Sequence, residues 1–156
     1  MARQLRIRPL TPDRIAQAYP LVQAALPEVS LGDWRDFAAP LVSPKAQPDA
    51  GIITVISERD YIAGLCSYHI AHDLRHGPAL IADHFLALDL FDQRAVVHAL
   101  AEAIESLAKD RLCTAIHTNL PETGAKISDG WLIRLLGNRG HRIESLRMCK
   151  VLRHTA

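Results

Sequence analysis

The stretch that decides the fold is residues 81–100, Ile81-Ala82-Asp83-His84-Phe85-Leu86-Ala87-Leu88-Asp89-Leu90-Phe91-Asp92-Gln93-Arg94-Ala95-Val96-Val97-His98-Ala99-Leu100. Its first part belongs to an apolar run from Ala79 to Asp89 that predicts a β-strand. Its second part opens a helix that runs to about Leu112, with an apolar stripe at helical spacing formed by Val97, Leu100, Ile104 and Leu107. A strand therefore passes through a short turn into a long helix.

Upstream of this stretch the sequence predicts two more strands, Ile52–Ser57 and Tyr61–His72. The connections between the three strands are short, which indicates an antiparallel meander. Before the meander the alternating segment Leu5–Leu10 predicts a first strand, and two helices follow it. Ser30, with Asp33 three residues later, predicts the start of the second of these helices, because this spacing is typical of a helix N-terminus.

Downstream of the long helix we expect a strand at Cys113–Thr118 and a last helix capped by Ser128, which ends near Asn138 to Gly140. The alternation in Leu146–Leu152 then predicts a strand that closes the sheet. No second domain is indicated, so residues 1–156 are expected to form a single domain.

Bulk composition excludes several classes of protein. The 156 residues are 49% hydrophobic and 22% charged, a globular balance, and the net charge of +1 gives no electrostatic case for nucleic acid. The N-terminal residues have no long apolar run, which argues against a signal peptide or membrane anchor. Three scattered cysteines, Cys66, Cys113 and Cys149, are typical of reduced core thiols, so we expect a cytoplasmic protein.

The order of these elements resembles the GNAT N-acetyltransferase fold over nearly the whole chain. Residues 81–100 are similar to the family's fourth strand, phosphate loop and long-helix start. Gly140-His141-Arg142, followed by Leu146-Arg147-Met148-Cys149-Lys150-Val151-Leu152, is similar to the common ending of the family. The resemblance implies an α/β (α+β) fold with a mixed, mostly antiparallel sheet. About four helices would flank this sheet, which would splay between the fourth and fifth strands.

The resemblance also implies where acetyl-CoA, the co-substrate, would lie. In the family the pantetheine occupies the gap between the splayed strands and bonds the fourth strand's backbone, here Leu86, Ala87 and Leu88. The pyrophosphate sits on amides at the N-terminus of the long helix, where unpaired N–H groups and the helix dipole favour an anion. Those amides belong here to Gln93, Arg94, Ala95, Val96 and Val97.

The phosphate loop departs from the family pattern at each defining position. Asp92, Ala95 and Val97 stand where the family has Gln or Arg, Gly, and Gly or Ala. Glycine lets a backbone approach phosphates without a Cβ in the way, and the branched Val97 adds bulk in the first turn. The Asp92 carboxylate can cap the amides that a phosphate would use, and it would repel the phosphate. Gln93 and Arg94 would compensate in part.

Asp83 and His84 are the catalytic candidates. Asp83 matches the strand position where many GNAT enzymes carry an acidic general base, and alternation along a strand places His84 on the opposite sheet face. Either group could take a proton from an ammonium ion. The alternative is structural, with Asp83 paired to an arginine and His84 a core or rim histidine.

Two other family features bear on chemistry. Leu136 stands where the family often has a Tyr general acid. His117 or water could take the place of that Tyr, and some members of the family do not need it. Asn119, at the end of the fifth strand, would either line the acyl pocket or cap the following turn. Trp34 and Phe37 are expected on one face of the second helix, in the part that covers the acceptor pocket in GNAT proteins, where Asp33 and Asp36 could attract a cationic amine. The alternative is a core face with a solvated acidic rim.

No metal site is predicted. His69, His72 and His76 lie close in sequence, but His69 and His72 are three residues apart on a strand and so face opposite sides. Zinc-type spacings of Cys and His are absent from the sequence.

These features favour an acyltransferase that moves an acetyl group from acetyl-CoA to an amine on a small molecule or peptide. No nucleic-acid or membrane partner is expected, and a homodimer is compatible with the sequence. Two alternatives stay open. One is a non-catalytic GNAT-fold binding or regulatory module, and the other is an acyltransferase whose donor lacks the CoA nucleotide.

Overall fold

A computed structural model describes residues 4–88, 92–120 and 130–153. The chain divides into two compact units, residues 1–124 and 125–156. The first contains the sheet and most of the helices. The second contains one helix and the C-terminal tail, and it is described separately.

The first unit is built on a five-stranded sheet in the order β1-β2-β3-β4-β5. Its strands are β1 (Arg6–Pro9), β2 (Ala50–Ile56), β3 (Ile62–Asp73), β4 (Gly77–Ala87) and β5 (Ala115–Thr118). Neighbouring strands from β1 to β4 are antiparallel, and β4 pairs with β5 in parallel. The predicted meander and the mixed, mostly antiparallel sheet are confirmed.

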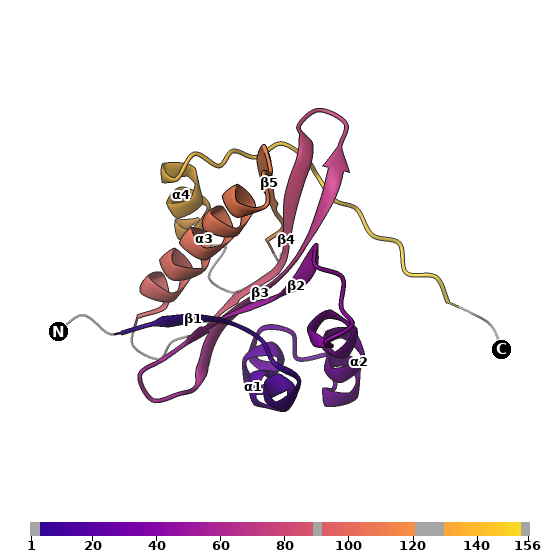
Figure 1. Ribbon diagram of the computed structural model, residues 1–156, viewed down its shortest axis with the longest axis vertical. Coiled ribbons are helices and arrows are strands. Elements are labelled where there is room, and N and C mark those ends of the chain that lie inside the picture. Colours follow the sequence, from indigo (N-terminus) through magenta and orange to yellow (C-terminus); the bar gives the residue numbers. More distant parts are fainter. Residues whose placement is uncertain (1–3, 89–91, 121–129, 154–156) are drawn as a thin grey trace. The chain divides into compact units, whose positions relative to one another are not determined.

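Helices cover both faces of this sheet (Figure 1). A short 3-10 turn, η1 (Pro12–Arg14), leads into α1 (Ile15–Ala25), and α2 (Leu31–Val42) lies beside α1 on one face. The long helix α3 (Gln93–Asp110) lies on the other face. Together with α4 (Trp131–Asn138) of the second unit, this gives the four helices expected from the sequence.

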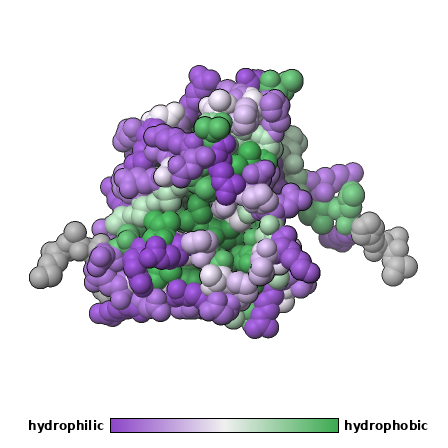
Figure 2. Space-filling view, in the orientation of Figure 1, coloured by the Kyte–Doolittle hydropathy of each residue, from purple (hydrophilic) through white to green (hydrophobic). Residues whose placement is uncertain are grey.

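Apolar side chains on the two sheet faces explain this layering. Leu65 and Leu86 join one core cluster with α1 and α2, which includes Ile15 and the buried Trp34. The opposite face meets α3 closely at Gly64, where an added Cβ would lie 2.6 Å from Cγ1 of Val96. In Figure 2 hydrophilic side chains cover the outer surfaces of α1, α2 and α3, and apolar side chains gather between them over the sheet.

The start of α2 confirms the capping signal in the sequence. The Ser30 hydroxyl accepts from the Asp33 amide at 3.0 Å, and the Asp33 carboxylate accepts from the Ser30 amide at 3.1 Å. The Ser30 hydroxyl also donates to the Asp33 carboxylate at 2.6 Å, and this bond, followed by the bond from the Ser30 amide, holds the pKa of Asp33 below its usual value. The Asp33 carboxylate is therefore committed to the helix start, which weakens its assignment to an amine-binding rim.

In the second unit, α4 ends where the sequence predicts, with Gly140 at φ 92° and the His141 amide donating to Leu136 at 3.0 Å. The predicted cap Ser128 lies outside the described residues. The predicted closing strand Leu146–Leu152 is wrong, because residues 141–153 have no strand and join no ladder with the described strands. Leu146 and Met148 are each 88% exposed, so alternation there is not matched by a buried face.

Candidate active site

The central feature of the site is a bulge in β4. Leu65 pairs with Leu86, but the next pair along the ladder is Ser67 with Asp83, so His84 and Phe85 together stand opposite Cys66. His84 has φ 52°, a left-handed conformation that costs a non-glycine residue about 1–2 kcal/mol. Such strained residues are often found at functional sites.

The bulge corrects the predicted placement of His84. A bulge interrupts the alternation of side chains, so consecutive residues reach one face. Nδ1 of His84 lies 2.8 Å from Oγ of Ser67, the residue that pairs with Asp83 across the sheet. The expectation that His84 and Asp83 face opposite sides is therefore wrong. Nothing in the sequence marks the bulge, since no glycine stands there.

Asp83 is held by neighbours on both adjacent strands. Asn119, just past the end of β5, donates through Nδ2 to Oδ1 of Asp83. On the other side Nδ1 of His69, on β3, lies 3.8 Å from Oδ2 of Asp83. The Asp83 side chain is 24% exposed, so it is accessible yet fixed. The alternative of an arginine partner for Asp83 is not what the described residues show.

The described contacts of Asn119 are with β4. Its backbone amide donates to Ala82 at 2.9 Å and its side chain donates to Asp83. Asn119 thus orients the candidate base and extends the β4–β5 pairing by one residue, while the turn it was expected to cap lies outside the described residues. Its proposed role in an acyl pocket is not tested by these contacts.

Helix α2 contributes one ring to the site. The Phe37 side chain is 40% exposed, so the alternative of a core face does not hold for it, whereas Trp34 is buried. The Phe37 ring makes an edge contact with the imidazole of His84, at 5.0 Å between centroids, and also stacks on Trp34 at 6.1 Å. An apolar ring from the helix layer thereby covers one side of the catalytic candidate.

The strands β4 and β5 separate beside this cluster. Their parallel register runs from Ala79 with Ala115 to Ala82 with Thr118, and Asn119 makes the last described contact. Beyond that point β4 continues to Ala87 with no described β5 partner on this edge. β4 therefore runs past the end of its described pairing with β5, as the expected splay between the fourth and fifth strands requires.

The backbone of Ala87 faces this open edge. The Leu88 amide donates to Ala63 of β3 at 2.7 Å, so the groups of the preceding residue point the other way, as alternation in an antiparallel pair requires. The Ala87 carbonyl accepts a hydrogen bond from Nε2 of Gln93 at 2.7 Å. Of the three strand residues expected to contact pantetheine, Leu86 has a buried side chain, and the Leu88 amide is already paired.

The N-terminus of α3 confirms the expected cap by Asp92. Oδ1 of Asp92 accepts from the Ala95 amide at 3.1 Å, so the carboxylate occupies a donor that a phosphate would use. Val96 and Val97 are 0% and 2% exposed and belong to the core. The Val97 side chain therefore points into the protein, and the steric objection to it is wrong. Arg94 is exposed beside this end of the helix.

The cysteines do not supply a nucleophile at this site. Cys66 is buried behind the bulge, and burial, followed by the nearby charge of Asp83, raises the pKa of its thiol. Burial also raises the pKa of the half-buried Cys113. Cys149 is exposed, so the expectation of three core thiols is wrong for that residue.

The expected stand-in for the missing Tyr, His117, lies in the middle of β5 and pairs with Ile81. Leu136, at the Tyr position, is buried in the second unit.

His117 also belongs to a cluster of metal-ligating side chains that was not predicted from the sequence. Its donor atoms lie close to those of Asp73 and His76. Of the three histidines considered for a metal, only His76 belongs to this group. No spacing signal could have found it, because the pairing of distant strands creates it.

Comparison with known proteins gives the class of fold. No protein-family model and no curated protein matches the sequence. Many solved structures match the fold, and three illustrate their range. An aminoglycoside N-acetyltransferase in complex with CoA is 12% identical with a TM-score of 0.73, covering 99% of this chain and 98% of its own. A glucosamine-6-phosphate N-acetyltransferase from Arabidopsis thaliana is 15% identical with a TM-score of 0.72, covering 96% and 99%.

The third structure, a transcriptional regulator from Bacillus halodurans C-125, is 14% identical with a TM-score of 0.73, covering 94% of this chain and 100% of its own. The chain thus has the GNAT acetyltransferase fold, at sequence identities of 12–15% to these structures. Because the matching structures include both enzymes and a protein described as a regulator, the fold alone does not decide the activity. Among residues 4–88, 92–120 and 130–153, no helix has the length and apolar character needed to cross a membrane.

Proposed function

We propose that this protein is an N-acyltransferase that transfers an acetyl group from acetyl-CoA to an amine, with Asp83 or His84 as general base. The observation that carries the proposal is the bulge in β4. It brings Asp83 and His84 to one face of the sheet, directly beside the edge where β4 and β5 separate.

The geometry around Asp83 suits proton removal from an ammonium ion. Asn119 donates to one carboxylate oxygen and fixes its direction, and His69 stands near the other. A base held in this way can accept a proton while the amine nitrogen attacks the thioester carbon. The N–C bond forms as the C–S bond breaks, and CoA leaves as its thiol once the thiolate has taken up a proton.

The open edge of β4 supports the position of the acyl donor. The Ala87 backbone faces the gap, and donors from β4 at that edge would polarise the thioester carbonyl. Gln93 bonds the Ala87 carbonyl, so its side chain must rotate away when pantetheine binds. The phosphates would then lie at the start of α3, with Arg94 beside them.

A second candidate is a binding module that does not take CoA. Two contacts favour it, since Asp92 occupies the Ala95 amide and Gln93 occupies the Ala87 carbonyl. In this case the cleft would serve another ligand or a partner protein. The two candidates differ in whether acetyl-CoA binds at all.

The test is calorimetric titration with acetyl-CoA beside dephospho-CoA and free pantetheine, followed by an acceptor screen. The acyltransferase predicts acetyl-CoA binding that weakens as the nucleotide is trimmed. If Asp83 is the general base, Asp83→Asn should then lower kcat about 10²–10⁴-fold, the range for loss of a general base, with acetyl-CoA affinity retained. Asp110→Asn at the exposed end of α3 makes the same charge change and should leave kcat unaltered. Absence of acetyl-CoA binding would rule out this function.

A further inference from the structure

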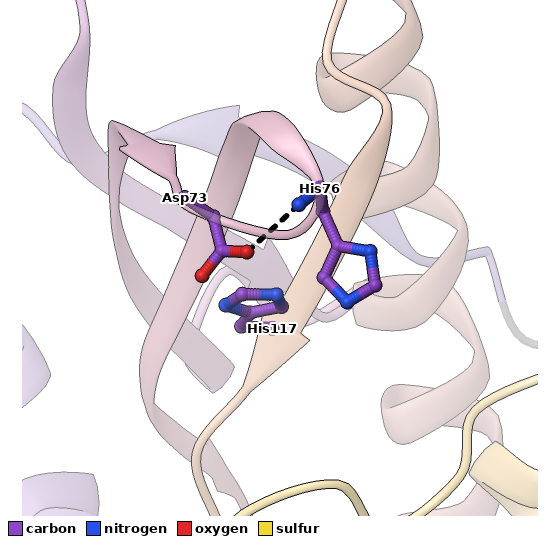
Figure 3. Close-up of side chains that lie close together, drawn as sticks. All are labelled: Asp73, His76 and His117. Atoms are coloured by element: carbon purple, nitrogen blue, oxygen red, sulfur yellow. Dashed lines mark hydrogen bonds between the residues drawn. The ribbon is translucent and has the colours of Figure 1, made fainter.

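Three side chains with metal-ligating atoms meet at the far end of the β3–β4 hairpin (Figure 3). Asp73 is the last residue of β3, His76 lies in the turn before β4, and His117 lies on β5. One ligand atom from each lies within 4.8 Å of the others. Figure 3 shows the Asp73 carboxylate above the His117 ring and the His76 imidazole at its side.

The fold holds two of these residues in position through the backbone. Oδ1 of Asp73 accepts from the amides of Arg75 and His76, each at 2.9 Å, which fixes both the carboxylate and the turn. The hydroxyl of Thr114, just before β5, donates to the His76 carbonyl, and the Thr114 amide donates to Pro78 at 2.8 Å. The turn and the start of β5 are therefore tied together independently of any ligand.

His117 gives a separate reason to expect a ligand. Its Nε2 is buried and has no hydrogen-bond partner among the described residues. Leaving a buried polar nitrogen unpaired costs about 1–3 kcal/mol. The edge contact between the His76 and His117 rings, at 5.5 Å between centroids, accounts for the orientation of the rings but not for this nitrogen. A bound ion would offset the cost.

The donor set defines the class of ion. Two imidazoles and one carboxylate are a combination that suits Zn²⁺ and similar divalent transition metals, and three protein ligands leave a further position for water or another ligand. Mg²⁺ and Ca²⁺ prefer oxygen ligands throughout, so they fit this set poorly. Bond lengths of about 2.0–2.2 Å would draw the three side chains closer together than they now lie.

We propose that Asp73, His76 and His117 bind one divalent transition-metal ion, with Zn²⁺ as the probe. Such an ion would fasten the β3–β4 hairpin to β5, since its ligands come from both. The site is separate from the proposed acyl transfer, although His117 pairs with Ile81, which is two residues, or about 7 Å along the strand, from Asp83.

The experiment titrates untagged, chelator-treated full-length protein with ZnCl₂ by calorimetry. We expect one ion per chain, and a loss of affinity of at least about tenfold in His76→Ala and again in His117→Ala, the scale of losing one first-shell ligand. His76→Ala keeps the backbone amide that donates a hydrogen bond to the Asp73 carboxylate, so the turn should keep its conformation. The matched control is His72→Ala, an exposed histidine next to Asp73 that should leave the affinity unchanged.

A second readout does not depend on heat. Co²⁺ in place of Zn²⁺ should give visible absorption that His76→Ala alters and His72→Ala does not. Circular dichroism checks that each variant is folded, and His76→Ala alone is sufficient if His117→Ala does not fold. No binding of Zn²⁺ up to millimolar concentration would overturn the proposal. Binding that neither His76→Ala nor His117→Ala weakens would overturn it equally.

Discussion

Asp92 controls the affinity for acetyl-CoA if the start of α3 holds the pyrophosphate. Its carboxylate accepts from the Ala95 amide at 3.1 Å, so it occupies a phosphate-binding donor and adds a negative charge there. Asp92→Asn removes the charge but keeps a capping side chain, whereas Asp92→Gly removes both. We expect both variants to bind acetyl-CoA more tightly than the native protein, and Asp92→Gly the more tightly of the two.

The electrostatic part of this effect is estimated from Coulomb's law. At about 6 Å and an effective dielectric constant of about 40–80, the carboxylate repels each singly charged phosphate by about 0.7–1.4 kcal/mol. Salt with a Debye length of about 8 Å roughly halves this, so two phosphates together give about 0.7–1.3 kcal/mol, or a factor of about 3–10 in Kd. The Ala95 amide released in Asp92→Gly adds about 1 kcal/mol, roughly a further fivefold.

Calorimetry with acetyl-CoA at low and physiological salt measures this change. The gain of Asp92→Asn should shrink as salt rises, because screening weakens the repulsion that the mutation removes. Free pantetheine lacks the phosphates, so its affinity should not respond. Asp110→Asn lies about 27 Å away at the other end of α3 and is the matched control for net charge.

Two results would refute the reasoning. If acetyl-CoA binds equally to the native protein and both Asp92 variants, the pyrophosphate does not lie at this helix terminus. If Asp110→Asn improves binding as much as Asp92→Asn, the effect comes from net charge and not from the local carboxylate. Asp92→Gly should cost the helix only a few tenths of a kcal/mol, so loss of folding is not expected to obscure the result.

Two further predictions concern packing and thiol chemistry. Gly64→Ala should lower the free energy of unfolding by about 1–3 kcal/mol, because the new Cβ would lie 2.6 Å from Cγ1 of Val96. Urea unfolding measures this loss of stability. An unchanged urea midpoint would mean that α3 packs less closely on the sheet. Iodoacetamide at pH 9 should modify Cys149 in the folded protein and leave Cys66 intact, since Cys149 is exposed and burial raises the pKa of the Cys66 thiol. Mass spectrometry of the peptides measures the labelling of each cysteine. Equal labelling of Cys66 and Cys149 would contradict the buried placement of Cys66.

The amino-acid sequence by itself determined the features that depend on neighbours along the chain. The stripe on α3, the capping box of Ser30 and Asp33, and the antiparallel meander follow from local spacing, and the structure has all three. The Asp92 cap on Ala95 is also local, three residues away on the same helix end, and was predicted for that reason. Short-range geometry is fixed by the period of the helix or strand, so the pattern alone is enough.

Only the tertiary structure decided how distant residues meet. The bulge that turns His84 to the face of Asp83 depends on pairing between β3 and β4. No residue type in β4 predicts this bulge. Asn119 reaches Asp83, and His117 reaches Asp73, because β5 pairs with β4 in a register that spacing along the chain does not specify. Alternation likewise suggests a strand, but a strand forms only where a partner satisfies its backbone groups.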